Sequence, residues 1–110
     1  TGAGAALMAA AELGERVRAV VSRGGRPDLA GDALGLVRAP TLLLVGGYDE
    51  PVIRLNEQAL AQLHCVKKLV IVPAATHLFE EPGKLEAVAQ LSIDWLRWHL
   101  RPLAEKEIMA

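Results

Sequence analysis

One short apolar run, bracketed by residues that interrupt regular structure, most constrains how this chain folds. Residues 41–45 are apolar after the initial threonine, with Pro40 before them and Gly46 and Gly47 after them. A strand with one face in water would alternate apolar and polar residues, and this run does not. We therefore expect a strand that is buried on both faces, as in a parallel sheet covered by helices.

Two further short apolar runs predict strands. Residues 17–22 are rich in valine and are followed by Gly24 and Gly25, and residues 69–72 end at Pro73. β-Branched residues bounded by glycine or proline are typical of strands. Residues 69–72 carry no polar side chain, so we expect this strand to be buried as well.

The segments between these runs predict helices and one loop. Residues 2–13 are small and alanine-rich, residues 53–63 have apolar positions on one side, and residues 84–100 repeat apolar residues every three or four positions. Residues 26–39 mix proline, glycine and aspartate, which indicates a loop with at most one helical turn. This order predicts an α/β fold whose mainly parallel sheet has three strands alternating with helices.

Three strands are few for a stable sheet. At least one edge, that of residues 17–22, is expected to pair with a strand that this chain does not supply. The chain opens on Thr1 without a methionine, and we interpret it as a piece of a larger protein. We expect a partial domain over residues 1–100 and a polar tail over residues 101–110. The exposed edge also predicts possible self-association.

Composition excludes several classes of protein. A length of 110 residues allows one domain, and 12 basic against 13 acidic side chains exclude a strongly basic nucleic-acid binder. The single cysteine cannot form an internal disulfide, which favours a reducing, cytoplasmic location. The longest apolar run is far shorter than the ~20 residues that span a bilayer, so we expect no membrane partner.

An acid and a histidine follow neighbouring strands. Asp49 comes shortly after the strand at 41–45, and His77 follows the strand at 69–72. Because the carboxyl ends of parallel strands meet at the same edge of a sheet, the two side chains are expected on one rim. There a carboxylate can accept the Nδ1–H of the imidazole and prepare it as a general base. A nucleophile for that base is missing.

Other reactive side chains fit this chemistry poorly. Ser22 is at the correct rim but lacks the strained turn that exposes an attacking hydroxyl. Arg23 and Arg26 flank the expected site and could attract an anionic substrate. His64 and Cys65 fall at the opposite, amino end of the sheet, and no histidine or cysteine spacing predicts a metal site.

Two longer stretches carry a resemblance to a known family. Gly-Gly-Tyr-Asp-Glu-Pro-Val at 46–52 and Ala-Thr-His-Leu-Phe-Glu-Glu-Pro-Gly at 75–83 resemble the C-terminal half of an α/β-hydrolase, in its dienelactone-hydrolase-like branch. The resemblance implies that Asp49 is the acid and His77 the base of a catalytic triad. The opening Thr1 and Gly2 match the last two positions of the family's Gly-x-Ser-x-Gly motif, so the nucleophile would stand just before Thr1.

The resemblance also implies the remaining parts of the reaction. The backbone N–H of Thr1 would be one oxyanion donor if a serine precedes it. The substrate would be a small-molecule ester or related acyl compound, with no metal and no organic cofactor. Our first hypothesis is therefore the C-terminal portion of a serine hydrolase, which lacks its nucleophile. The alternative is a non-catalytic α/β module that pairs through its exposed sheet edge with another chain.

Overall fold

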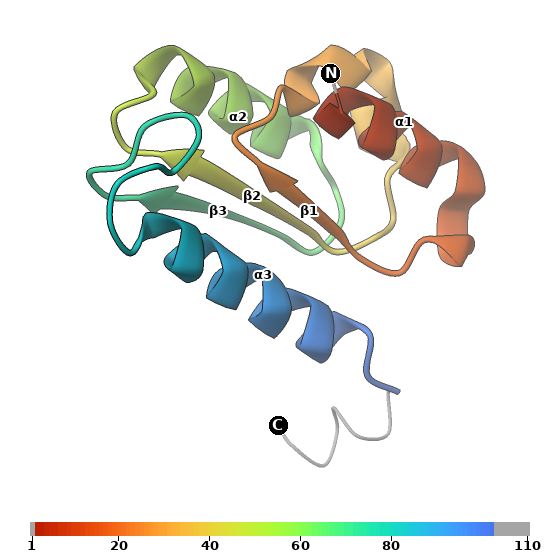
Figure 1. Ribbon diagram of the computed structural model, residues 1–110. Helices are drawn as coiled ribbons and strands as arrows, with labels where there is room; N and C mark the ends of the chain where they lie inside the picture. The colour runs from red at the N-terminus through yellow and green to blue at the C-terminus, as the bar shows by residue number, and fades with distance from the viewer. Residues whose placement is uncertain (1, 103–110) are drawn as a thin grey trace.

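A computed structural model describes residues 2–102 of the chain. Helices and strands alternate along these residues, as the sequence predicted (Figure 1). In chain order the elements are α1 (Gly2–Leu13), η1 (Gly14–Arg16), β1 (Val20–Arg23), η2 (Pro27–Leu36), β2 (Thr41–Gly46), α2 (Glu50–Gln62), β3 (Lys67–Val72) and α3 (Lys84–His99). The η elements are short 3₁₀-helical segments. The predicted oxyanion donor Thr1 and most of the predicted tail, residues 103–110, lie outside the described residues.

The three strands form one parallel sheet in the order β1-β2-β3. Val20 of β1 is in register with Thr41, the first residue of β2. The predicted start of this strand at residue 17 was therefore wrong, because residues 17–19 precede the point where the neighbouring strand begins. The predicted α/β class and the parallel arrangement are confirmed.

Helices cover both faces of the sheet (Figure 1). The helical layer of α1, η2 and α2 lies on one face, and α3 lies on the other. The loop expected over residues 26–39 is instead largely helical, because η2 consists of two short helices joined at Gly31. Gly31 has φ +55° and ψ −129°, a conformation open to glycine, so it links the two pieces at a sharp kink. The buried side chains of η2, Ala30 and Leu34, pack into the same layer as α1.

The central strand β2 belongs to two hydrophobic cores. Every residue of β2 is buried, as predicted. Leu43 packs with the helical layer of α1, η2 and α2, whereas Leu42 and Leu44 pack on the other face with Val88 of α3. Alternate side chains of a strand point to opposite faces, so one apolar run serves both cores.

The third strand is less buried than predicted. Only Val72 at the end of β3 is buried, and Ile71 is 45% exposed. β3 is an outer strand of the described sheet, and α3 lies against β1 and β2 instead of covering it. At the start of β3, Lys67 Nζ donates to the carbonyls of Leu60 and Leu63 at 2.7 and 2.8 Å. A lysine beside the C-terminal end of a helix bonds favourably to its last carbonyls, so Lys67 ties the start of β3 to the end of α2.

The length and hydropathy of the helices bear on whether any of them could cross a membrane. Within residues 2–102, no helix combines the length and the apolar character that crossing a bilayer requires.

Candidate active site

Asp49 is positioned by a tight turn at the end of β2. The turn closes through the Asp49 amide, which donates to the Gly46 carbonyl at 3.0 Å. Amides of Gly47 and Tyr48 donate to the carbonyls of Val72 and Ala75, at 2.8 and 3.0 Å. The turn that carries the acid is therefore bonded directly to the segment that leads to His77.

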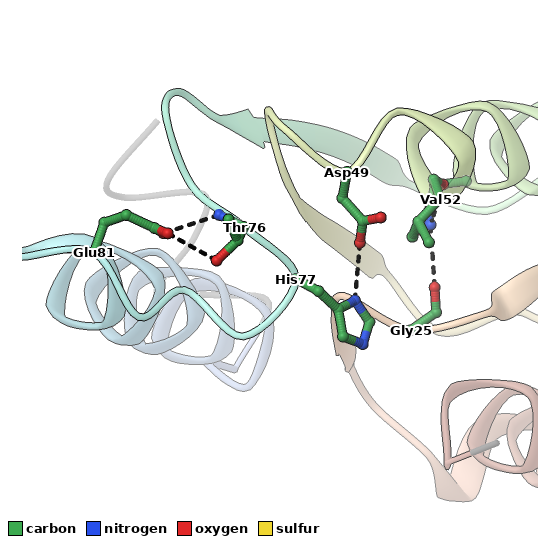
Figure 2. A network of polar contacts seen from close by, with 7 residues as sticks. Gly25, Asp49, Val52, Thr76, His77 and Glu81 are labelled. Atoms are coloured by element: carbon green, nitrogen blue, oxygen red, sulfur yellow. Dashed lines mark hydrogen bonds and ion pairs between the residues drawn. The ribbon is translucent and has the colours of Figure 1, made fainter.

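Asp49 occupies the N-cap position of α2 without acting as a side-chain cap. An aspartate at this position usually accepts a hydrogen bond from an amide of the first helical turn. Here no such bond is formed, and the carboxylate turns to His77 instead (Figure 2). The Asp49 side chain therefore joins the two predicted site residues and does not cap the helix.

The Asp49–His77 contact is a short polar pair at the carboxyl edge of the sheet. His77 Nδ1 lies 2.8 Å from Asp49 Oδ2. The aspartate side chain is 18% exposed and the histidine side chain 57% exposed. An ionised carboxylate can only accept, so Nδ1 of a neutral ring carries the proton and Nε2 is left as the acceptor. A half-exposed imidazole prepared in this way can take a proton from an incoming hydroxyl.

The loop that carries His77 is held by a second carboxylate. The backbone N–H and the hydroxyl of Thr76 donate to the two oxygens of Glu81, at 2.9 and 2.7 Å (Figure 2). These hydrogen bonds, above all the one from the Thr76 amide, lower the pKa of Glu81 below its usual value. Two bonds to one planar carboxylate fix the residue directly before His77.

The lowered pKa of Glu81 gives a testable pH dependence. A carboxylate whose pKa is depressed by folding stabilises its loop above the unfolded pKa, and this contribution is lost as the pH falls through the folded pKa. We expect the amide proton shift of Thr76 to titrate with a midpoint below 4.5, the ordinary value for glutamate. Glu81→Gln should remove the titration and speed Thr76 amide exchange by about tenfold. The matched control Glu80→Gln should leave both unchanged, and a similar loss there would contradict the assignment.

Glycine is required at two points beside the pair. A Cβ on Gly46 would lie 2.4 Å from the Ala75 carbonyl oxygen and 2.6 Å from that of Thr76. A Cβ on Gly24, which has φ +60°, would lie 2.9 Å from the carbonyl oxygen of His77. The backbone beside the histidine is therefore packed too closely for any side chain at either position.

Arg23 and Ser22, the last two residues of β1, differ in whether they can reach the site. Arg23 lines a hollow of about 140 Å³ with His77, Leu78, Phe79 and Leu85, so it borders the site. Ser22 is buried, and its hydroxyl has no hydrogen-bond partner among the described residues. A buried hydroxyl cannot reach a substrate, which agrees with its rejection as a nucleophile.

Arg26 is held by its own neighbour. Its guanidinium makes two hydrogen bonds to the Asp28 carboxylate, each 2.9 Å long. These bonds lower the pKa of Asp28 and keep the pair charged. Arg23 is therefore the better placed of the two arginines to meet an anionic group.

His64 and Cys65 lie away from the pair, as predicted. They follow α2 at the amino end of β3, and the half-buried thiol of Cys65 is 3.8 Å from the Thr41 hydroxyl at the start of β2. Among residues 2–102, no three His, Cys, Asp or Glu side chains gather as a metal site would require.

Sequence reasoning missed the residues that support the pair. Glu81 bonds to Thr76 in the His77 loop, a side chain at Gly24 would meet the His77 backbone, and the fully buried Asn56 bonds to Gly25 and to Val52 of α2. The Thr76–Glu81 spacing was visible in the sequence, but only the path of the loop brings the two side chains together. Asn56 was visible as a polar residue on a helix face that is otherwise apolar.

The parallel three-stranded sheet, its helices on both faces and the Asp–His pair at its carboxyl edge match part of the α/β-hydrolase fold. No family model matches the sequence. Among solved structures, a dienelactone hydrolase from Anabaena variabilis superposes with a TM-score of 0.90 and 67% sequence identity. The match covers 92% of this chain and 47% of that one. The predicted resemblance is confirmed: in fold and in sequence this chain is dienelactone-hydrolase-like.

Curated relatives carry a different name. Two proteins from Mycobacterium tuberculosis, of strains CDC 1551 and H37Rv, are each 64% identical to this chain over 100 residues. Both are named, provisionally, as phosphoribosyl transferases. The alignment covers 91% of this chain but only 23% of each relative, so the chain spans about a quarter of their length.

Proposed function

We propose that this chain forms part of a serine hydrolase that cleaves carboxylic esters or related acyl bonds, with Asp49 and His77 as the acid and base of its triad. The observation that carries the proposal is the 2.8 Å contact between His77 Nδ1 and Asp49 Oδ2 at the carboxyl edge of the sheet. The 67% identity to a protein named as a dienelactone hydrolase supports the same reaction class.

The chemistry assigns the proton transfers to His77 and the orientation of its ring to Asp49. His77 Nε2 takes the proton of a serine hydroxyl as the serine oxygen bonds to the acyl carbon. The same nitrogen returns this proton to the leaving alcohol when the bond between carbon and leaving oxygen breaks. A water molecule then repeats both steps on the acyl-enzyme and releases the acid. Asp49 holds the ring and stabilises the imidazolium that forms in each step.

Contacts at the start of α1 support a nucleophile just before Thr1. A Cβ on Gly25 would lie 2.4 Å from Ala3 Cβ, so the first turn of α1 packs directly on the Gly24–Gly25 turn. A Cβ on Gly24 would lie 2.9 Å from the His77 carbonyl oxygen and 3.5 Å from its Nδ1, so this turn also lies beside His77. We therefore infer that a serine just before Thr1, as the hydrolase resemblance implies, would lie on the same side of the molecule as His77. The Thr1 amide would then be an oxyanion donor.

We propose hydrolysis in preference to phosphoribosyl transfer. The transferase name belongs to relatives of which this chain matches 23%, whereas the hydrolase name belongs to a structure of which it matches 47%. The Asp–His pair supplies a general base, as acyl transfer through a serine requires. The proposed reaction uses a small ester or acyl substrate and needs no metal or organic cofactor.

A second candidate function rests on the edges of the sheet. Within the described residues β1 and β3 are outer strands, and an outer strand leaves a row of backbone donors and acceptors free to pair with another chain. A non-catalytic module that binds a partner chain, or a second copy of itself, through such an edge is the alternative.

One measurement separates the two candidates. The intact mass of the native protein from its source would be determined before and after treatment with a fluorophosphonate probe, which labels activated serines. A mass well above 11.8 kDa that shifts by one adduct is the expected result. A mass that matches the 110 residues, without an adduct, would overturn the hydrolase proposal and favour the module.

We also propose a cytoplasmic location for the protein. The support is the single, unpaired Cys65, because cysteines remain reduced in that compartment. Fractionation of the source cells before the mass measurement tests this, and recovery from a secreted fraction would contradict it.

A further inference from the structure

The Gly24–Gly25 turn after β1 is the point where the parts of the proposed site meet. Its first amide, on Gly24, donates to the Leu44 carbonyl of β2 at 2.7 Å. A Cβ on Gly24 would lie 3.5 Å from His77 Nδ1, and one on Gly25 would touch Ala3 of α1. One side of the turn therefore lies against the His77 imidazole, and the other side lies against the start of α1.

Asn56 ties this turn to the helix that follows Asp49. Its side chain is fully buried, and Nδ2 donates to the Gly25 carbonyl at 3.2 Å and to the Val52 carbonyl at 2.8 Å. Val52 lies in the first turn of α2, close to Asp49. One amide group thus links the turn behind His77 to the first turn of the helix whose N-cap position is Asp49.

An asparagine at this position is unfavourable for stability alone. Its Oδ1 is buried and has no hydrogen-bond partner among the described residues. Burying such a group without a partner lowers stability, and asparagine is a poor helix former. Ala59 and Leu63, the other fully buried side chains of this helix and its end, are apolar. The two bonds made by Nδ2 are therefore the feature that distinguishes Asn56 from an apolar alternative.

We propose that Asn56 is a positioning residue that sets the distance between His77 and Asp49. It acts through the Gly25 carbonyl: with that bond in place, Gly24 fills the space behind the imidazole and keeps Nδ1 within reach of the carboxylate. Among residues 2–102, the Asp49 contact is the one hydrogen bond of the half-exposed His77 ring, so a shift of the turn frees the ring to rotate. The catalytic meaning of this role rests on the proposed hydrolase function, but the placement itself does not.

Nitrogen NMR of the histidine rings in the 110-residue chain tests the placement without any assay of hydrolysis. At a pH where the ring is neutral, the two ¹⁵N shifts distinguish the Nδ1–H tautomer from the Nε2–H tautomer, and His77→Gln identifies the His77 signals. The wild-type chain is expected to hold the Nδ1–H tautomer. Asn56→Ala should lower the ratio of the Nδ1–H tautomer to the Nε2–H tautomer by about tenfold. The isosteric Asn56→Asp, which lacks the donor, should lower this ratio by a similar factor.

Two further variants separate positioning from general stability. The threonine hydroxyl in Asn56→Thr can still bond to the Val52 carbonyl within the helix, but it cannot reach Gly25. This variant should therefore lower the tautomer ratio as much as Asn56→Ala does, while it unfolds less readily than Asn56→Ala. Leu60→Ala, one turn along the same helix, removes core packing without touching the turn, and it should leave the ratio unchanged. A wild-type ratio in Asn56→Thr would overturn the positioning role. An Nε2–H tautomer in the wild-type chain would instead overturn the Asp49–His77 pair, and with it the proposed function.

Discussion

Replacing His77 by glutamine should lower kcat/KM for ester hydrolysis by about 10⁴-fold in a protein in which a Gly-x-Ser segment and its strands precede Thr1. Glutamine keeps much of the size of the ring but cannot accept and return a proton near neutral pH. The serine would then attack without a base, and the leaving alcohol would depart without an acid. Steady-state rates with a small activated ester measure the effect.

The matched control for this variant is His64→Gln. His64 is exposed at the opposite edge of the sheet, beside the start of β3. Its replacement should leave kcat/KM within about twofold, because surface changes away from a site have small effects. Equal losses in the two variants, or full activity in His77→Gln, would show that His77 is not the base.

Replacing Gly46 by alanine should lower the free energy of unfolding by about 2–3 kcal/mol. The new methyl group would lie 2.4 and 2.6 Å from the backbone oxygens of Ala75 and Thr76. Backbone atoms cannot turn aside as the end of a flexible side chain can. The strand end and the loop before His77 must therefore move apart, which strains the bond from the Tyr48 amide to Ala75. Urea unfolding of the chain measures the change as a lower midpoint.

Gly35→Ala provides the comparison for this substitution. The nearest atom to its added Cβ is 3.7 Å away, on the His64 ring, which is an ordinary contact. Its effect on the free energy of unfolding should stay within about 0.5 kcal/mol. If Gly46→Ala were equally mild, the close packing between the ends of β2 and β3 would not be what fixes the two loops.

The sequence predicted the parts of the fold that depend on local pattern. The uninterrupted apolar run of β2 predicted that this strand is buried on both faces. The spacing of apolar residues in α3 predicted the bounds of this helix to within one residue. Because the carboxyl ends of parallel strands share one edge of a sheet, the sequence also predicted that Asp49 and His77 lie on the same edge. These features are encoded by residues that lie close together in the chain.

Features that depend on distant neighbours could not be predicted in the same way. The apolar run at 69–72 looks the same whether a strand is central or outer, so the exposure of Ile71 was missed. The start of β1 is set by where β2 begins, and η2 lies packed against α1, a neighbour distant in the chain. The bond from Asn56 to Gly25 joins residues 31 positions apart, which no local pattern reveals.

The hydrogen bonds between the ends of β2 and β3 have a consequence for how the acid–base pair can be inherited. Asp49, His77 and the bonds from Gly47 and Tyr48 that align their loops all lie within one continuous β-α-β segment, residues 41–77. A gene fusion, a duplication or a recombination that carries this segment intact would transmit both residues together with the bonds that align their loops, while the Gly24–Gly25 turn that backs His77 and the Glu81 carboxylate that holds Thr76 would come from outside it. The distance to a serine, by contrast, would have to be re-established through α1 and the Gly24–Gly25 turn each time.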